Sequence, residues 1–222
     1  MGHRRHAALL VRFAGLTLVA ALACIPALAR GAAAVEGTVT LPERPPPPAP
    51  NPRYPVKTAG IIGRPDPPAS VVYLEIGARP IATPKRAEMG QLHYQFAPGL
   101  LPIERGATVA FPNFDDEYHS VFSYSKPKRF DLGRYHKDEQ PAELVFDQPG
   151  LVKLFCEIHD HMRGTILVLE TPHFQKTAPD GRYRLEGLPA GRHVLKAWVD
   201  ENTVWQRPVD LVEGKTLRVD LP

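Results

Sequence analysis

The sequence predicts an all-β protein in which a β-sandwich is followed by a second, smaller β unit. From about Leu92 onward, short runs rich in β-branched, aromatic and aliphatic residues are separated by Pro, Gly and Asp turn signals, which is typical of sandwiches and barrels. No long amphipathic helix pattern occurs after residue 29. After Glu170 a new series of alternating polar and apolar runs begins, and it predicts about four further strands.

The expected strands of the first sandwich are His93–Phe96, Thr108–Phe111, Ser120–Tyr124, Glu143–Phe146, Val152–Cys156 and Thr165–Glu170. The polar and irregular stretch Ser125–Gln140 predicts a long surface loop. The C-terminal strands are expected within Asp180–Leu185, Val194–Val199, Pro208–Val212 and Thr216–Leu221. So small a unit buries little surface alone, so it must pack on the first sandwich or on two earlier expected strands, Thr38–Leu41 and Ser70–Leu74.

The first 29 residues have the pattern of a cleavable signal peptide. A basic start precedes an apolar run from Ala7 to Leu28, and Ala27-Leu28-Ala29 supplies the small residues of a cleavage site. A retained membrane anchor is the alternative, but Arg12 and Pro26 leave only a short clean apolar stretch for a span. We therefore expect a periplasmic protein without a stable membrane span in its mature chain.

Residues 30–69 are rich in proline and include the run Pro45–Pro48, which favours extended polyproline conformation and cannot join a central strand. This stretch is expected to be an arm or linker with one short strand. The expected sandwich domain then spans residues 70–170, and the smaller β unit spans residues 171–222.

The charge balance argues against a polyanion as partner. The chain has 27 basic and 24 acidic residues and a formal net charge of +3. Arg4, Arg5 and Arg12 lie in the expected signal peptide, and without these three the mature chain has 24 basic residues against 24 acidic ones. A neutral mature chain does not favour binding to nucleic acid.

Cys156 is the only cysteine after the expected signal peptide, where Cys24 is a poor match to a lipid-attachment site. Exported proteins normally pair their cysteines, so an unpaired one needs an explanation. The alternatives are intermolecular pairing, an inert buried thiol, a nucleophile or a metal-binding thiolate. The neighbours favour a metal, because His159 and Met162 follow in a Cys-x-x-His-x-x-Met pattern between two expected strands. Blue-copper sites need two imidazoles, a thiolate and a weak axial thioether. His119, which precedes an apolar run, is the candidate for the second imidazole.

Other polar groups near this pattern carry weaker signals. His161 is expected to be exposed and not to bind the metal, and four further histidines have no partner pattern: His93, His136, His173 and His193. The acidic trio Asp115, Asp116 and Glu117 is expected to form a solvated turn, with a docking patch for a basic partner as the alternative.

Four segments together resemble the cupredoxins, most closely the amicyanin and plastocyanin group and the periplasmic plastocyanin-like proteins labelled methylamine utilisation proteins. They are Phe111-Pro112-Asn113, His119-Ser120-Val121, Phe146-Asp147-Gln148-Pro149-Gly150 and the Cys156 to Gly164 loop. The resemblance covers about residues 90–170. It implies a Greek-key sandwich and one type 1 copper centre whose ligands are His119, Cys156, His159 and Met162. It also implies electron exchange with a redox partner such as a c-type cytochrome or a periplasmic dehydrogenase.

One position departs from this resemblance. Amicyanin-like proteins usually carry Asn after the first histidine ligand, where it braces the ligand loops, and this sequence has Ser120. The C-terminal part resembles the carboxypeptidase regulatory-like, transthyretin-like β module, through Asp180-Gly181-Arg182-Tyr183 and the turn Gly187 to Gly191. That second resemblance implies an Ig-like packing or interaction unit without chemistry of its own.

Three functions are compatible with Cys156 and its neighbours. Single-electron carriage on one copper is the expected one, and copper binding or delivery without redox duty is the alternative. The mature chain has one Cys and two Met residues, which is thin for a delivery site. Catalysis with Cys156 as nucleophile is disfavoured, because no oxyanion-site or substrate-pocket motif accompanies it. The sequence therefore predicts a protein that is not an enzyme.

Overall fold

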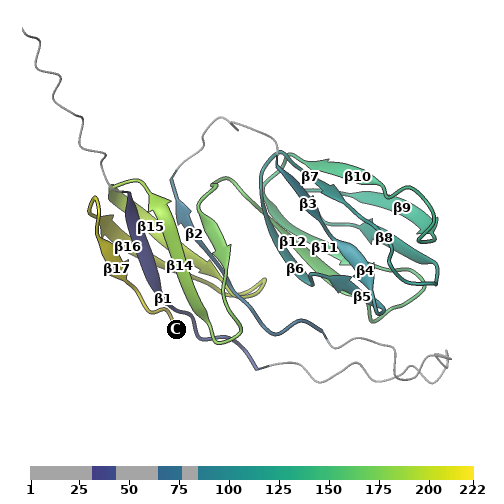
Figure 1. Ribbon diagram of the computed structural model, residues 1–222, viewed down its shortest axis with the longest axis horizontal. Helices are drawn as coiled ribbons and strands as arrows, with labels where there is room; N and C mark the ends of the chain where they lie inside the picture. The colour runs from purple at the N-terminus through teal and green to yellow at the C-terminus, as the bar shows by residue number, and fades with distance from the viewer. Residues whose placement is uncertain (1–31, 44–64, 77–84) are drawn as a thin grey trace, which may run out of the picture. The chain divides into compact units, whose positions relative to one another are not determined.

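The computed structural model describes residues 32–43, 65–76 and 85–222, and all regular secondary structure in these ranges is β (Figure 1). The all-β prediction is confirmed. No helix in the described ranges is long and apolar enough to cross a membrane. The expected signal peptide, Cys24 and the run Pro45–Pro48 lie outside the described residues.

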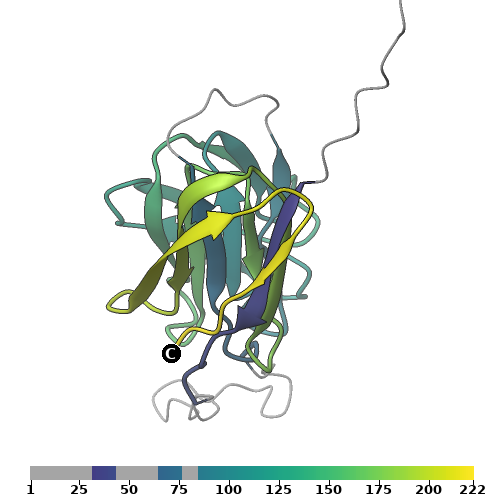
Figure 2. The same cartoon turned by 90° about the vertical axis from the view of Figure 1, so that its left-hand side faces the viewer.

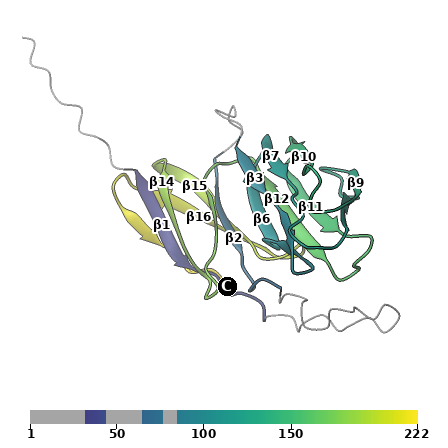
Figure 3. The same cartoon turned by 45° about the vertical axis from the view of Figure 1, so that its right-hand side comes forward.

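Ten strands between residues 86 and 169 form the first sandwich. They are β3 (Arg86–Glu88), β4 (Gly90–Leu92), β5 (Gln95–Ala97), β6 (Leu100–Glu104), β7 (Ala107–Ala110), β8 (His119–Ser123), β9 (Phe130–Tyr135), β10 (Glu143–Phe146), β11 (Gly150–Phe155) and β12 (Arg163–Leu169). One sheet has the order β6-β12-β11-β8-β9, another has the order β10-β7-β3, and β4 pairs with β5 in a hairpin (Figure 1). Figure 3 shows β3, β7 and β10 of the three-stranded sheet from another side.

Apolar side chains from these sheets form one core. On β11, Val152 and Leu154 are buried while their sequence neighbours are only half-buried, as the two-residue period of a strand requires. They belong to the same buried cluster as Phe111, which directly follows β7, and as Cys156 and Met162 from the loop after β11. The predicted ligand loop is thus anchored in the core of the first sandwich.

The expected surface loop Ser125–Gln140 is wrong in its middle, where β9 pairs antiparallel with β8. Phe130 and Leu132 pack against the core and Tyr135 is buried, whereas Asp131 and Arg134 are exposed. The two-residue alternation holds from Phe130 to Leu132 and then changes phase at an irregularity before Arg134, and the charged exposed residues give the segment a polar composition. Composition concealed this edge strand.

Seven further strands form the second sandwich. They are β1 (Ala33–Thr38), β2 (Val71–Glu75), β13 (Phe174–Lys176), β14 (Arg182–Leu188), β15 (Gly191–Trp198), β16 (Val204–Leu211) and β17 (Thr216–Arg218). Their sheets have the orders β14-β1-β17 and β13-β2-β15-β16. Figure 2 shows β1 in purple beside the C-terminal strand in yellow, and the two pair in parallel. Apolar residues from both sheets share one buried cluster.

The early strands therefore supply the packing partner that the C-terminal strands require. β1 begins earlier than the expected Thr38–Leu41, and Val39 adds an isolated bridge to Leu221. β2 pairs with β13 and β15, so the expected range 70–170 assigns it to the wrong sandwich. The reason is that pairing across sequence separations of more than one hundred residues leaves no local signal. The resemblance to a carboxypeptidase regulatory-like module stays a prediction.

Candidate metal centre

The pairing of β8 with β11 brings the expected ligands to one end of the five-stranded sheet. The two strands are antiparallel, with Phe155 opposite Phe122, so the start of β8 lies beside the end of β11. His119 is the first residue of β8, and Cys156 directly follows β11. His159 and Met162 lie in the connection from Cys156 to β12. Residues that are far apart in the sequence thus meet through strand register.

Three of the four predicted side chains form a compact donor group. The candidate ligand atoms of His119, Cys156 and His159 all lie within 4.8 Å of one another. The two Nδ1 atoms are 3.0 Å apart, and the Cys156 Sγ is 3.8 Å from the His159 Nδ1. His119 and Cys156 are buried, whereas His159 is half-buried. The group therefore has one imidazole closed off from solvent and one that reaches toward it.

Met162 lies in the same part of the sandwich core. Its side chain is fully buried, in the cluster that also contains Cys156. Its backbone N–H donates to the His159 carbonyl oxygen over 2.9 Å, which closes a tight turn between the two residues. The turn keeps the thioether on the same short loop as the thiol and the imidazole.

The surroundings of Cys156 favour a thiolate. Burial raises the pKa of the thiol, but hydrogen bonds from His119 and His159 and from the Ser120 backbone outweigh burial and lower that pKa to about 5. Burial lowers the pKa of His119, yet its hydrogen bonds to Cys156 and Asp115 outweigh burial and leave that pKa raised. The two pKa shifts are consistent with each other, because both favour a Cys156 thiolate beside a protonated His119 ring.

Ser120 joins the two ligand-bearing segments. Its Oγ accepts the backbone N–H of Glu157 over 2.8 Å, and its own N–H points to the Cys156 Sγ over 3.5 Å. The hydroxyl also lies 3.8 Å from that sulfur. Ser120 is almost fully buried. Ser120 therefore ties the loop after β11 to β8.

Asp115 is buried against His119, so the prediction of a solvated turn is wrong for this residue. Its Oδ2 lies 2.9 Å from the His119 Nε2. Asp116 and Glu117 are exposed, as expected. Sequence analysis missed the role of Asp115 because three adjacent acidic residues resemble a solvated charge run. The spacing of four residues before His119 was the available signal.

Tyr94 is a further residue that sequence analysis did not single out. Its ring packs edge-on against the rings of both His119 and His159, with centroid separations of 5.6 and 5.0 Å. The expected strand His93–Phe96 is wrong at its start, because His93 and Tyr94 form the turn between β4 and β5 with φ values of 52° and 58°. Neither residue is a usual turn former, so the sequence carried no signal for this turn.

His161 also differs from its prediction. The ring is half-buried rather than exposed, and its Nε2 donates to the Tyr94 carbonyl oxygen over 3.1 Å. This contact directs that nitrogen to the backbone. The group of converging donors consists of His119, Cys156 and His159.

The donors fit a type 1 copper ion by their chemistry. Two imidazole nitrogens and a thiolate sulfur are the strong ligands of such a site, and a thioether such as that of Met162 is its usual weak axial ligand. The lowered pKa of Cys156 supplies the thiolate without a large cost of deprotonation.

Comparisons with known proteins found partial structural likenesses. No family model matches the chain, and no curated protein matches it. A copper-containing nitrite reductase from Thermus scotoductus SA-01 is 25% identical with a TM-score of 0.36, over 45% of this chain and 25% of that chain. Amicyanin from Paracoccus versutus is 24% identical with a TM-score of 0.35, over 40% and 84% of the two chains. A purple cupredoxin from Nitrosopumilus maritimus is 23% identical with a TM-score of 0.34, over 37% and 99%.

The chain thus spans a quarter of the length of the nitrite reductase. At these TM-scores the likenesses concern only part of the chain, and the functional conclusion depends on the chain's own residues.

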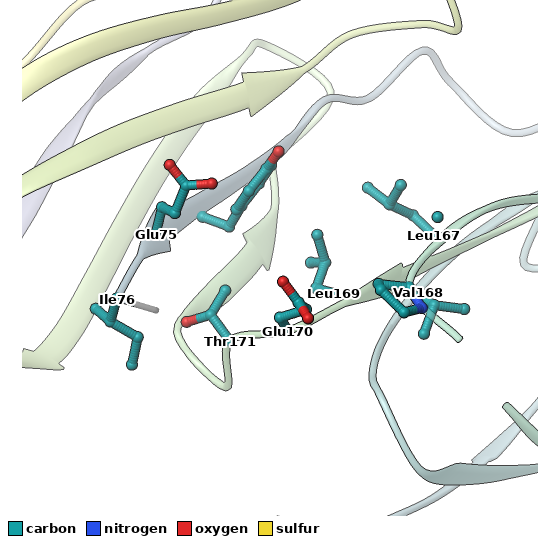
Figure 4. Close-up of a pocket in the computed structure, with 10 residues that line it drawn as sticks. Glu75, Ile76, Leu167, Val168, Leu169, Glu170 and Thr171 are labelled. Atoms are coloured by element: carbon teal, nitrogen blue, oxygen red, sulfur yellow. The ribbon is translucent and has the colours of Figure 1, made fainter. Parts of the chain in front are cut away.

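A surface pocket elsewhere offers no comparable donor group. It has a volume of about 360 Å³ and is lined by the end of β2 and the end of β12 (Figure 4). Figure 4 shows the carboxylates of Glu75 and Glu170 and the hydroxyl of Thr171 among its polar groups. Glu75 already pairs with Lys196 over 2.8 Å. None of the three converging donors lines this pocket.

Proposed function

We propose that this chain is an exported, periplasmic type 1 copper protein that carries single electrons between redox partners. The observation that supports this most directly is the convergence of His119, Cys156 and His159 within 4.8 Å at one end of the first sandwich. Met162 supplies the axial thioether. A bound copper ion contributes a one-electron couple between its two oxidation states.

The chain's own residues suit such a couple because they hold the ligands still. Cys156 and Met162 are fixed in the core, and Ser120 bonds the loop back to β8. Ligands that do not rearrange between oxidation states lower the cost of each electron exchange. Stiffness of this kind favours electron carriage over delivery, since a delivery site must release its metal.

His159 is the proposed exit for the electron, because its ring is half-buried while His119 is fully closed off. Next to these two ligands in sequence, Ile158 and Tyr118 expose 40% and 54% of their surface. The exposed Ile158 beside His159 offers an apolar contact for a redox protein. A c-type cytochrome or a periplasmic dehydrogenase is the proposed partner class.

Loading the purified protein with copper(II) tests this function. We expect an intense blue thiolate-to-copper absorption band that is abolished in Cys156→Ser. His159→Ala should weaken the band strongly, whereas His161→Ala, in the same loop, should retain it. A colourless loaded wild-type protein would contradict the proposal. Rapid reduction by a c-type cytochrome is expected, and a blue protein that exchanges electrons only slowly would instead indicate copper delivery.

A further inference from the structure

The carboxylate of Asp115 accepts hydrogen bonds from three directions. Its Oδ2 lies 2.9 Å from the His119 Nε2 and accepts the Tyr94 backbone N–H over 2.9 Å. Its Oδ1 accepts the His93 backbone N–H over 2.7 Å. Only 8% of the residue is exposed. The two backbone N–H groups can only donate, and an ionised carboxylate, which only accepts, suits all three nitrogen partners.

The carboxylate is itself held in place by its own loop. The Asp115 backbone N–H donates to the Asn113 Oδ1 over 2.9 Å. The Asn113 amide in turn donates to the carbonyl oxygens of Glu117 and Tyr135, over 2.7 and 3.1 Å. This network ties the loop before β8 to β9 on the neighbouring edge. Asp115 therefore acts from a fixed position.

The contact with His119 determines which ring nitrogen faces the donor group. An ionised Asp115 only accepts, so the His119 Nε2 donates to it, and a ring that releases its Nδ1 proton presents the Nδ1 lone pair. That Nδ1 lies 3.0 Å from the His159 Nδ1 and faces the site of the proposed metal. Partners of this kind orient metal-binding imidazoles and raise their basicity.

The same carboxylate stabilises the turn that carries Tyr94. Residues other than glycine seldom adopt positive φ, and His93 and Tyr94 both do so, at 52° and 58°. Asp115 accepts the N–H groups of both residues. The turn places the Tyr94 ring edge-on against His119 and His159. The Asp115 side chain thus contacts the His119 ring directly, and it supports the rings of both His119 and His159 through Tyr94.

We propose that Asp115 is a positioning residue of the metal centre that also sets its reduction potential. The inference rests on the proposed copper function. A buried negative charge one imidazole away from the metal stabilises copper(II) more than copper(I), because the oxidised ion carries the larger charge. Asp115 therefore lowers the reduction potential, in addition to fixing the tautomer of His119. In the described residues, no lysine or arginine forms an ion pair with Asp115 that would neutralise this charge.

The test compares Asp115→Asn with Asp116→Asn in the full-length copper-loaded protein. Both variants remove one negative charge from the same loop, but Asp116 is exposed and pairs with Lys137. We expect Asp115→Asn to reduce the ratio of copper(II) to copper(I) affinity at least tenfold, which raises the one-electron potential by about 59 mV. Asp116→Asn should change that ratio less than threefold, because solvent screens its charge.

If the reduction potential of Asp115→Asn shifts no more than that of Asp116→Asn, the inference about Asp115 is overturned. A blue wild-type protein would in that case still uphold the proposed function. A colourless wild-type protein would overturn both. Asp115→Glu covers the case in which Asp115→Asn does not fold. It keeps the charge and should leave the affinity ratio within threefold of wild type, and a tenfold fall in this variant would contradict the electrostatic role. Nitrogen-15 NMR of the metal-free protein should show His119 protonated at Nε2, and a ring protonated at Nδ1 alone would contradict the positioning role.

Discussion

Replacing Ser120 with alanine should destabilise the fold and weaken copper binding together. The Ser120 Oγ accepts the Glu157 N–H over 2.8 Å at a position that is only 1% exposed. In Ser120→Ala that N–H loses its partner, and the loop after β11 loses its bond to β8. The Ser120 backbone N–H toward the Cys156 Sγ is retained, so the sulfur keeps one of its donors.

The size of the effect follows from the cost of an unsatisfied donor. Leaving a buried N–H without its partner costs about 1–3 kcal/mol. Glu157 itself is exposed, so water can reach part of the loop, and we expect the lower half of that range. For a chain of this size, each kcal/mol changes the melting temperature by about 2–4 °C. Urea unfolding of the metal-free protein should therefore show a loss of about 1–2 kcal/mol.

Ser125→Ala is the matched control for this experiment. The Ser125 Oγ accepts the Lys153 N–H over 2.9 Å, so the change deletes the same kind of bond between neighbouring segments away from the ligand loop. Both variants should lose similar free energy of unfolding, but only Ser120→Ala should release copper more readily in competition with a chelator. Equal copper affinity in the two variants would refute the view that Ser120 braces the site.

Two further predictions concern the thiol and the second sandwich. In the metal-free protein, the ultraviolet absorbance of the Cys156 thiolate should titrate with a midpoint near 5, because the pKa is lowered from 9.0. The lowered pKa stabilises the folded protein fully above pH 9, and this stabilisation is lost as the pH falls toward 5. His119→Ala should raise the midpoint, because it removes a hydrogen bond to the sulfur. An unchanged midpoint would contradict that cause. Gly37→Ala should cost about 2–4 kcal/mol without loss of blue colour, because its Cβ would lie 1.8 Å from the Val219 carbonyl oxygen. Gly99→Ala, whose Cβ would meet no atom closer than 3.8 Å, is the control, and equal stabilities of the two variants would refute the steric argument.

The grouping of candidate ligands was predicted from short-range patterns. Cys156, His159 and Met162 lie within one loop, so their spacing alone indicated a shared site, and the structure brings the first two together. His119 was harder to place, because its position depends on the register of β8 against β11. The apolar run after His119 predicted a strand, but only the pairing shows that the ring reaches Cys156.

The features that sequence analysis missed depend on contacts between distant segments. Asp115 is buried by His93 and Tyr94, which belong to a hairpin about twenty residues earlier. β2 lies between β13 and β15, and its sequence is equally compatible with either sandwich. Neither burial of a charge nor the choice of sheet is encoded by local periodicity, which specifies only the faces of a strand.

The strand order of the second sandwich has a consequence for folding. β1 and β2 precede the strands of the first sandwich in the chain, whereas their partners β13, β14, β15 and β17 follow those strands. As the chain emerges from its N-terminal end, the segment 86–169 can complete its own three sheets while β1 and β2 still lack neighbours. We therefore expect the first sandwich, with its group of converging donors, to fold before the second sandwich. Until Val219 has emerged, β1 cannot accept the hydrogen bond from the Val219 N–H to the Glu36 carbonyl oxygen, so its edge toward β17 stays unpaired.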